Sequence, residues 1–135
     1  MVVPNRLPTI VVLGGINMDL ISITNRIPNP GETIPGEEFY TSPGGKGANQ
    51  AVAAAQIGAN VRMVGRVGND TFAPVLLESL KGYCIDTSGV ATDNDASSGI
   101  AVILLNDQRE NRIIAIYGAN MRCDAEQLSA VKLAL

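Results

Sequence analysis

The stretch "SPGGKGANQAVAAAQIGAN", residues 42–60, places glycines on both sides of Lys46 and then runs directly into an alanine-rich segment. Alanine has the highest helix propensity, so residues 48–57 are predicted to form a helix, and Gly58 is predicted to end it. A glycine-rich turn before a helix often cradles phosphate. The same arrangement also suits another polar ligand, or serves only as a tight turn.

The stretch does not fit the P-loop motif GxxxxGK[ST]. Gly45 and Lys46 match, but Tyr40 stands at the first glycine position and Gly47 replaces the hydroxyl residue that would hold magnesium. Two of the four fixed positions therefore fail, which argues against a P-loop.

The dinucleotide-binding motif GxGxxG also fails, although a suitable strand is predicted. Residues 9–15, "TIVVLGG", read as a buried parallel strand that ends in glycines. The following residues include Asn17 and Asp19, where small side chains should admit a pyrophosphate. An aspartate there would repel the anion, so a dinucleotide site is not expected.

Asn17 and Asp19 instead indicate a site for a neutral polyol. They follow the carboxyl end of the first predicted strand, which is the usual ligand-binding edge of an open α/β sheet. In an extended chain residues i and i+2 point to one side, and an amide with a carboxylate offers donors and several acceptors. Lys46 and Asn49 lie at the predicted helix start, and the glycines at 44, 45 and 47 are expected to let a ligand approach the backbone. The alternative is that both side chains cap local backbone and that Lys46 is a solvated surface charge.

The remaining segments predict an α/β fold with a mainly parallel sheet. Strands are predicted at 60–68 and 89–93, and a helix at 69–85 with Asp70 as its N-cap. Residues 19–41 and 98–117 are rich in β-formers and predict a small additional sheet with a hairpin. A last helix is predicted at 123–135 with Asp124 as N-cap and with Leu128, Val131 and Leu135 on one face. Since that helix is still apolar at the final residue, we expect the chain to be truncated.

The composition limits the possible functions. The 135 residues suffice for one domain, 46% of them are hydrophobic, and the net charge is −3 without any run of basic residues. Nucleic acid and anionic membranes are therefore not expected partners. The sequence contains no histidine, and its two cysteines, Cys84 and Cys123, are expected to be buried and unpaired, as in a reducing cytoplasm. No apolar run approaches the roughly 20 residues of a membrane span.

A longer pattern resembles the ribokinase-like (pfkB) carbohydrate kinases. Their first signature is [AG]-G-x(0,1)-[GAP]-x-N-x-[STA]-x(6)-[GS]-x(9)-G. It is matched throughout, spacers of six and nine residues included, by Gly44, Gly45, Lys46, Gly47, Ala48, Asn49, Gln50, Ala51, Gly58 and Gly68. "GGINMDL" also resembles the N-x-D sugar motif of the family, "PNPGET" its lid entry, and "SGIAVILLN" with the later "GAN" its returning lid strands. The lysine within "GGKGANQAVAAA" is similar to the ribose-phosphorylating branch.

This resemblance implies a three-layer α/β sandwich, with lid strands around 19–41 and 98–117. Residues 1–135 would be its N-terminal part, without the nucleotide-binding half. The implied activity is ATP-dependent phosphorylation of D-ribose to D-ribose 5-phosphate, with Mg²⁺ and a monovalent cation such as K⁺, in a cytoplasmic enzyme that forms a homodimer through its lid. The implied sugar-binding residues are Asn17, Asp19, Gly45, Lys46, Gly47, Asn49, Ala101 and Ile103.

One departure from the family limits this reading. The GAGD-like motif that carries the family's catalytic aspartate and anion hole is missing from the sequence. We therefore expect no catalytic base and no metal site in this chain, and no turnover from it alone. A kinase for another sugar or a nucleoside remains an alternative, as does a non-catalytic fragment that binds sugar or dimerises.

Overall fold

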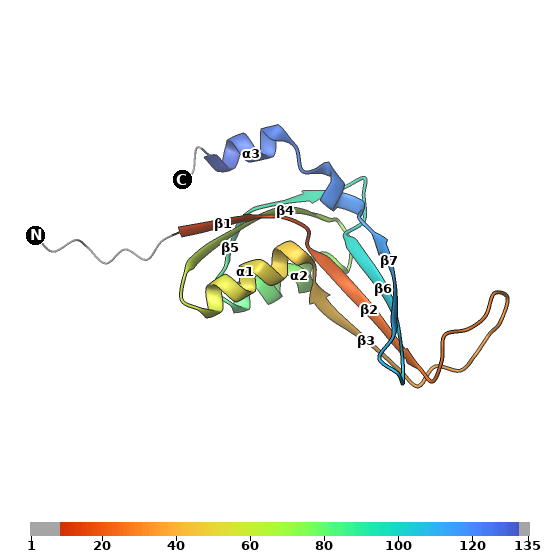
Figure 1. The fold of residues 1–135 in the computed structure, drawn as a ribbon. Coiled ribbons are helices and arrows are strands. Elements are labelled where there is room, and N and C mark those ends of the chain that lie inside the picture. Colours follow the sequence, from red (N-terminus) through yellow and green to blue (C-terminus); the bar gives the residue numbers. More distant parts are fainter. Residues whose placement is uncertain (1–8, 133–135) are drawn as a thin grey trace, which may run out of the picture.

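The computed structural model describes residues 9–132 and consists of two sheets and their covering helices (Figure 1). Sheet A has the strand order β1-β4-β5, and sheet B has the order β3-β2-β6-β7. The elements are β1 (Thr9–Leu13), β2 (Asn17–Thr24), β3 (Glu38–Gly44), α1 (Lys46–Gln56), β4 (Asn60–Gly68), α2 (Phe72–Gly82), β5 (Asp86–Asp93), β6 (Gly99–Asn106), β7 (Asn111–Ile116), the 3₁₀ helix η1 (Gly118–Arg122) and α3 (Ala125–Lys132).

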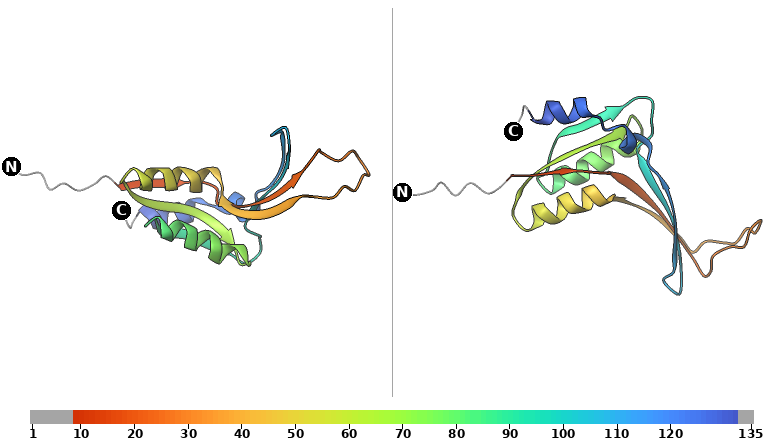
Figure 2. Two further views of the ribbon diagram at one scale, coloured as in Figure 1. Left: turned by 90° about the horizontal axis from the view of Figure 1, so that it is seen from below. Right: turned by 45° about the horizontal axis from the view of Figure 1, so that its top comes forward.

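Sheet A is entirely parallel and lies between two layers of helices. Strand β4 pairs in parallel with both β1 and β5. Helices α1 and α2 cover one face of the sheet, and α3 lies over the other (Figures 1 and 2). The predicted three-layer α/β arrangement with a parallel sheet is therefore confirmed.

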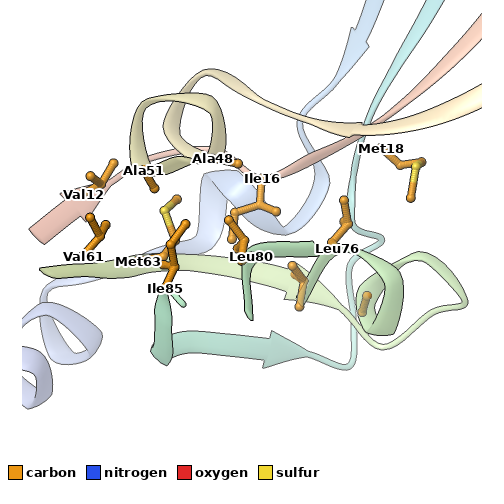
Figure 3. Close-up of a cluster of buried hydrophobic side chains, with 12 residues drawn as sticks. Val12, Ile16, Met18, Ala48, Ala51, Val61, Met63, Leu76, Leu80 and Ile85 are labelled. Atoms are coloured by element: carbon orange, nitrogen blue, oxygen red, sulfur yellow. The ribbon is translucent and has the colours of Figure 1, made fainter. Parts of the chain in front are cut away.

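A shared apolar core joins sheet A to α1 and α2 (Figure 3). Met63 and Val67 from β4 are fully buried, and Leu76 and Leu80 from α2 are almost so. The cluster comprises Val12, Ile16, Met18, Ala48, Ala51, Val61, Met63, Val67, Ala73, Leu76, Leu80 and Ile85. Since Ile16 and Met18 belong to it, the start of β2 is fixed to the same core that holds the helices.

Helix α1 begins two residues earlier and ends one residue earlier than predicted, and Gly58 terminates it as expected. Gly58 has a positive φ of 96°, and its N–H donates to the carbonyl of Ala55 while the next N–H, of Ala59, donates to that of Ala54. This paired pattern is the Schellman termination, in which glycine meets the left-handed requirement without strain. Lys46 thus lies in the first helical turn rather than in a preceding loop.

Helix α2 ends in the same way, but with Cys84 in the left-handed position. Cys84 has a φ of 58° and donates its N–H to the Lys81 carbonyl, while Ile85 donates to Leu80. The expectation that both cysteines are buried is wrong for Cys84, which is exposed, and Cys123 is only half-buried. Both are free thiols, as predicted.

Replacing Cys84 with glycine is expected to stabilise the fold by about 0.5–1 kcal/mol, because it relieves the left-handed strain of a residue that has a Cβ. The midpoint of urea unfolding would measure this gain. Cys84→Ser retains the Cβ and is the matched control, for which we expect no gain. Equal stabilisation by both variants would show that the thiol, and not the backbone, was the source.

Sheet B extends from the carboxyl edge of sheet A and continues two of its strands (Figure 1). Residues 14–16 lead from β1 into β2, and residues 94–98 lead from β5 into β6. Strands β2 and β6 pair in parallel, while β3 and β7 flank them in antiparallel pairings. The predicted hairpin and its extension of the small sheet are confirmed, and the strands fall close to the predicted segments.

Helix α3 is attached to sheet A by polar contacts. Asp124 accepts a hydrogen bond from the Gln127 N–H at 2.9 Å, as expected of an N-cap. The Gln127 side chain donates to the carbonyls of Gly65 and Gly89 and accepts from Arg66. Leu128 is 39% exposed. Leu135 and the side chain of Val131, predicted on the same face, lie outside the described residues.

Candidate sugar-binding site

The candidate site lies at the start of β2, where sheet B leaves sheet A. Asn17 and Asp19 are the first and third residues of this strand, so their side chains share one face. The backbone pairing sets glycines on both sides of Asn17, namely Gly44 and Gly99. The predicted arrangement of an amide beside a carboxylate at the sheet edge is therefore present.

Small side chains surround Asp19, and larger apolar ones follow along the same face. Asp19 pairs with Ser42 on β3 and with Ala101 on β6, which itself pairs with Ala115 on β7. The next row on this face contains Ile21 with Tyr40, Ile103 and Ile113. The predicted residues Ala101 and Ile103 thus lie on the Asp19 face, one row apart.

The Asp19 carboxylate is half-buried. Among residues 9–132 it has no hydrogen-bond or ion-pair partner. It lies over Gly44, where an added Cβ would come within 2.5 Å of Asp19 Oδ2. Burial raises the pKa of the Asp19 carboxyl above its usual value of 3.8. A partly desolvated acceptor without a partner is a group that gains from hydroxyl donors of a ligand.

Asn17 differs from Asp19 because its side-chain oxygen already has a partner. Asn120 in η1 donates its Nδ2 hydrogen to Asn17 Oδ1 at 2.7 Å. The sequence does not predict a role for Asn120 at this site, because sequence patterns do not relate residues 103 positions apart.

The start of α1 closes one end of the site. Gly45 precedes the helix with a positive φ of 97°, and an added Cβ would lie 2.6 Å from the Gly15 carbonyl oxygen and 2.8 Å from the Asn17 nitrogen. Lys46 and Asn49 are exposed on the first turns, and Asn49 shares a cavity of about 20 Å³ with Gly44. Gly45, Lys46 and Asn49 therefore lie in the same region as Asn17.

The predicted glycines make room for protein atoms, which differs from the expectation that they make room for a ligand. Gly47 is buried, and an added Cβ would lie 2.6 Å from the carbonyl carbon of Gly14 and 2.7 Å from its Cα. Gly44 makes room for Asp19 in the same way. The glycine-rich loop thus permits backbone-to-backbone packing of α1 against residues 14–15.

A second polar cluster supports the passage from β5 to β6. Asp70 accepts hydrogen bonds from the N–H groups of Phe72 and Ala73, as an N-terminal cap of α2 should, and also from the N–H and hydroxyl of Ser98 at 2.7 and 2.8 Å. The fully buried Ser98 accepts in turn from the Gly68 N–H. Burial by itself would raise the pKa of Asp70, but hydrogen bonds from Ser98, Ala73 and Phe72 outweigh it and lower that pKa.

Asp70→Asn is expected to lower the free energy of unfolding by about 2–3 kcal/mol near pH 7. The substitution removes a charged hydrogen-bond acceptor and turns an amide N–H group toward the hydrogen-bond donors that Asp70 accepts from. Since the folded pKa is depressed, the stabilisation by Asp70 is complete above the unfolded value near 3.8 and disappears as the pH falls through the folded pKa. Urea unfolding between pH 2 and 7 would measure both effects. Asp107→Asn, at an exposed turn position, is the control. An equally small loss of stability in both variants would show that the hydrogen bonds of Asp70 do not stabilise the fold.

Other features of the described residues do not form a second candidate site. A hollow of about 580 Å³ lies beside α2, lined in part by Asp70, Pro74 and Thr92, and it includes none of the predicted sugar-binding residues. Between residues 9 and 132 no three His, Cys, Asp or Glu side chains gather as metal ligands would. None of the helices in that part of the chain has the length and apolar character that crossing a bilayer requires.

Comparison with solved structures assigns the fold to a known class. The structure of Arabidopsis thaliana ribokinase complexed with ribose and ATP superimposes with a TM-score of 0.76 at 36% sequence identity, over 85% of this chain and 37% of the other. The two sheets and their helices therefore form the N-terminal part of a ribokinase-like α/β fold.

Sequence comparison then defines the family. Residues 7–135 match the pfkB family of carbohydrate kinases. Ribokinase from Mus musculus is 44% identical over 119 residues, which cover 88% of this chain and 37% of the relative. Deoxyribokinase from Salmonella typhi is 41% identical over 119 residues, which cover 88% of this chain and 39% of the relative. The chain belongs to the pfkB carbohydrate kinase family, and it spans less than two fifths of the length of these relatives.

Proposed function

We propose that this chain supplies the sugar-binding part of a kinase that transfers phosphate from ATP to D-ribose and produces D-ribose 5-phosphate. The observation that carries the proposal is the partly buried Asp19 carboxylate, which has no partner among the described residues and stands beside Asn17 at the sheet edge. Sugar hydroxyls are the ligand groups that suit such an acceptor without introducing charge repulsion.

In this proposal each predicted residue has a role that follows from its surroundings. Asn17 and Asp19 bind adjacent hydroxyls of the sugar, while Gly45, Lys46 and Asn49 contact it from the start of α1. Ala101 and Ile103 contact its apolar side from β6, since they lie on the Asp19 face. Gly47 acts indirectly, because its packing against Gly14 holds α1 in place.

Sheet B is proposed to act as a lid over the sugar. Closure of this sheet over the sugar would exclude water, so that the sugar, rather than water, receives the phosphate. The sheet exposes Phe39, Tyr40, Ile113 and Ile114, with exposed fractions of 66, 46, 55 and 66%. Tyr40 and Ile113 lie on the Asp19 face, and Phe39 and Ile114 lie on the opposite face, so each face of the sheet exposes apolar side chains. These side chains support the further proposal that two copies associate through this sheet.

The nucleotide and its metal ions are not assigned to residues of this chain. The described residues contain no group of three His, Cys, Asp or Glu side chains that could hold Mg²⁺. ATP, Mg²⁺ and K⁺ remain implied by the family, and we propose that residues outside this chain bind them and supply the base. The free thiols favour a reducing cytoplasm as the location of the enzyme.

Phosphorylation of 2-deoxyribose is the second candidate function. A deoxyribokinase shares 41% identity with this chain, a value close to that of the mouse ribokinase. Kinases for other sugars or nucleosides would require a pocket that fits a hexose or a base.

The proposal is tested by ATP-dependent ADP release from the complete protein that carries these residues. The acceptors are D-ribose, 2-deoxy-D-ribose, D-fructose and adenosine, and product mass with NMR identifies the phosphorylated carbon. We expect the highest kcat/KM for D-ribose, with phosphate at C5. A higher value for deoxyribose would support the second candidate, while comparable activity with fructose or adenosine would overturn both. Sugar binding without any ADP release would indicate a non-catalytic binding protein.

A further inference from the structure

The side chain of Asn120 connects η1 to the first residues of β2. Its Oδ1 accepts the Ile16 N–H at 3.0 Å, and its Nδ2 donates to the Ile16 carbonyl at 3.2 Å and to Asn17 Oδ1 at 2.7 Å. The neighbouring residue anchors the short helix, because Ala119 is fully buried and donates its N–H to the Ser97 carbonyl at 2.7 Å. Asn120 is thus held from both sides.

These contacts fix which end of each amide faces which partner. The Ile16 N–H only donates and the Ile16 carbonyl only accepts, so the Asn120 oxygen must face the first and its NH₂ group the second. The remaining Asn120 hydrogen then points to Asn17, whose oxygen must accept it. Both hydrogens of Asn17 Nδ2 consequently remain available in other directions.

The amide pair is closely packed against two glycines. An added Cβ on Gly99 would overlap both Asn120 Nδ2 and Asn17 Oδ1, and one on Gly15 would lie 3.6 Å from the Asn120 amide. The two carboxamides therefore occupy the space that side chains at 15 and 99 would otherwise take. Asn17 and Asp19 differ in this respect, since Asp19 has no such partner in the described residues.

We propose that Asn120 is a positioning residue that makes Asn17 a hydrogen-bond donor toward the sugar, beside Asp19 as the acceptor. This proposal rests on the proposed sugar-binding function. Together the two side chains require one ligand hydroxyl that accepts and a neighbouring hydroxyl that donates. Asn120 does not touch the sugar. It determines which end of the Asn17 amide faces the sugar.

The test replaces Asn120 with aspartate in the complete protein and measures the Kd for D-ribose by calorimetry. The new carboxylate still accepts from Ile16 but cannot donate to Asn17, so the Asn17 amide must turn its hydrogens inward and present its oxygen to the sugar. We expect Kd to rise at least ~10-fold, as for the loss of one well-formed hydrogen bond. Asn94→Asp makes the same chemical change at an exposed loop position and should leave Kd unchanged.

A double-mutant cycle separates positioning from general damage to the fold. If Asn120 acts through Asn17, then Asn120→Asp should change Kd less than about twofold in an Asn17→Ala background. The same ~10-fold loss in both backgrounds would overturn the proposal, as would an unchanged Kd for Asn120→Asp alone. Absence of ribose binding by the unmodified protein would instead overturn the proposed function, and this inference with it.

A second variant addresses the case in which Asn120→Asp does not fold. Asn17→Asp retains the inward acceptor for Asn120 but removes the outward donor, so folding should be preserved while ribose affinity falls at least ~10-fold. Unchanged ribose affinity in that variant would show that the sugar does not use a donor from position 17, which also overturns the proposal.

Discussion

Replacing Asp19 with alanine is expected to weaken D-ribose binding at least ~100-fold and to reduce kcat/KM by a similar factor. The carboxylate is partly buried and has no partner among the described protein groups, and hydrogen bonds to a charged group contribute about 1.5–3 kcal/mol each. Calorimetric titration of D-ribose into the complete protein would measure the loss. Asp107→Ala, which removes an exposed carboxylate from the β6–β7 turn, should bind ribose normally.

The affinity for ribose should also depend on pH through Asp19. Only the ionised carboxylate accepts hydrogen bonds at both oxygens, and burial raises its pKa above 3.8. Ribose affinity should therefore decrease as the pH falls, beginning at a higher pH than for an ordinary aspartate. An Asp19→Ala variant that binds ribose as tightly as the unmodified protein would remove the basis of the proposed site.

Gly47→Ala is expected to destabilise the fold by about 3 kcal/mol or more, although alanine is the better helix former. The added methyl would lie within 3 Å of three backbone atoms of Gly14 and Gly15, which cannot move as a side chain does. The free energy of urea unfolding would measure the loss. Because α1 would be pushed away from Asn17, ribose affinity should fall as well.

A matched glycine-to-alanine substitution in α2 should have the opposite effect on the free energy of unfolding. Gly82 is the last residue of α2, and no atom lies within 4 Å of an added Cβ. Gly82→Ala should therefore stabilise the protein by about 0.5–1 kcal/mol, following helix propensity alone. If both variants changed stability in the same direction, the contact between α1 and residues 14–15 would not be the reason for glycine at 47.

Local features of the fold could be predicted because each depends on neighbouring residues. The alanine run with Gly58 determines α1 and its end, and Asp124 caps α3. The exposed left-handed Cys84 was missed, because cysteine gives no local signal for that conformation. The pairing of β2 with β6 follows only from the tertiary fold, although the β-rich segments themselves were recognised.

The candidate site was predictable to the extent that its residues are close in sequence. Asn17 and Asp19 form an i, i+2 pair, and the strand β2 brings them to one face. The purpose of the glycines was not predictable, because the space beside Gly47 is filled by Gly14, more than 30 positions earlier. The same limit applies to Asn120, whose role depends on a contact across most of the chain.

The hydrogen bond between Asn17 and Asn120 also has a consequence for synthesis on the ribosome. The two residues are 103 positions apart, so at translation rates of about 5–20 residues per second the partner of Asn17 is made roughly 5–20 s later. During that interval the nascent chain exposes the unpaired edge of β2, which is later covered by β6. Slower elongation over this region should therefore prolong the period in which the nascent chain is prone to aggregation.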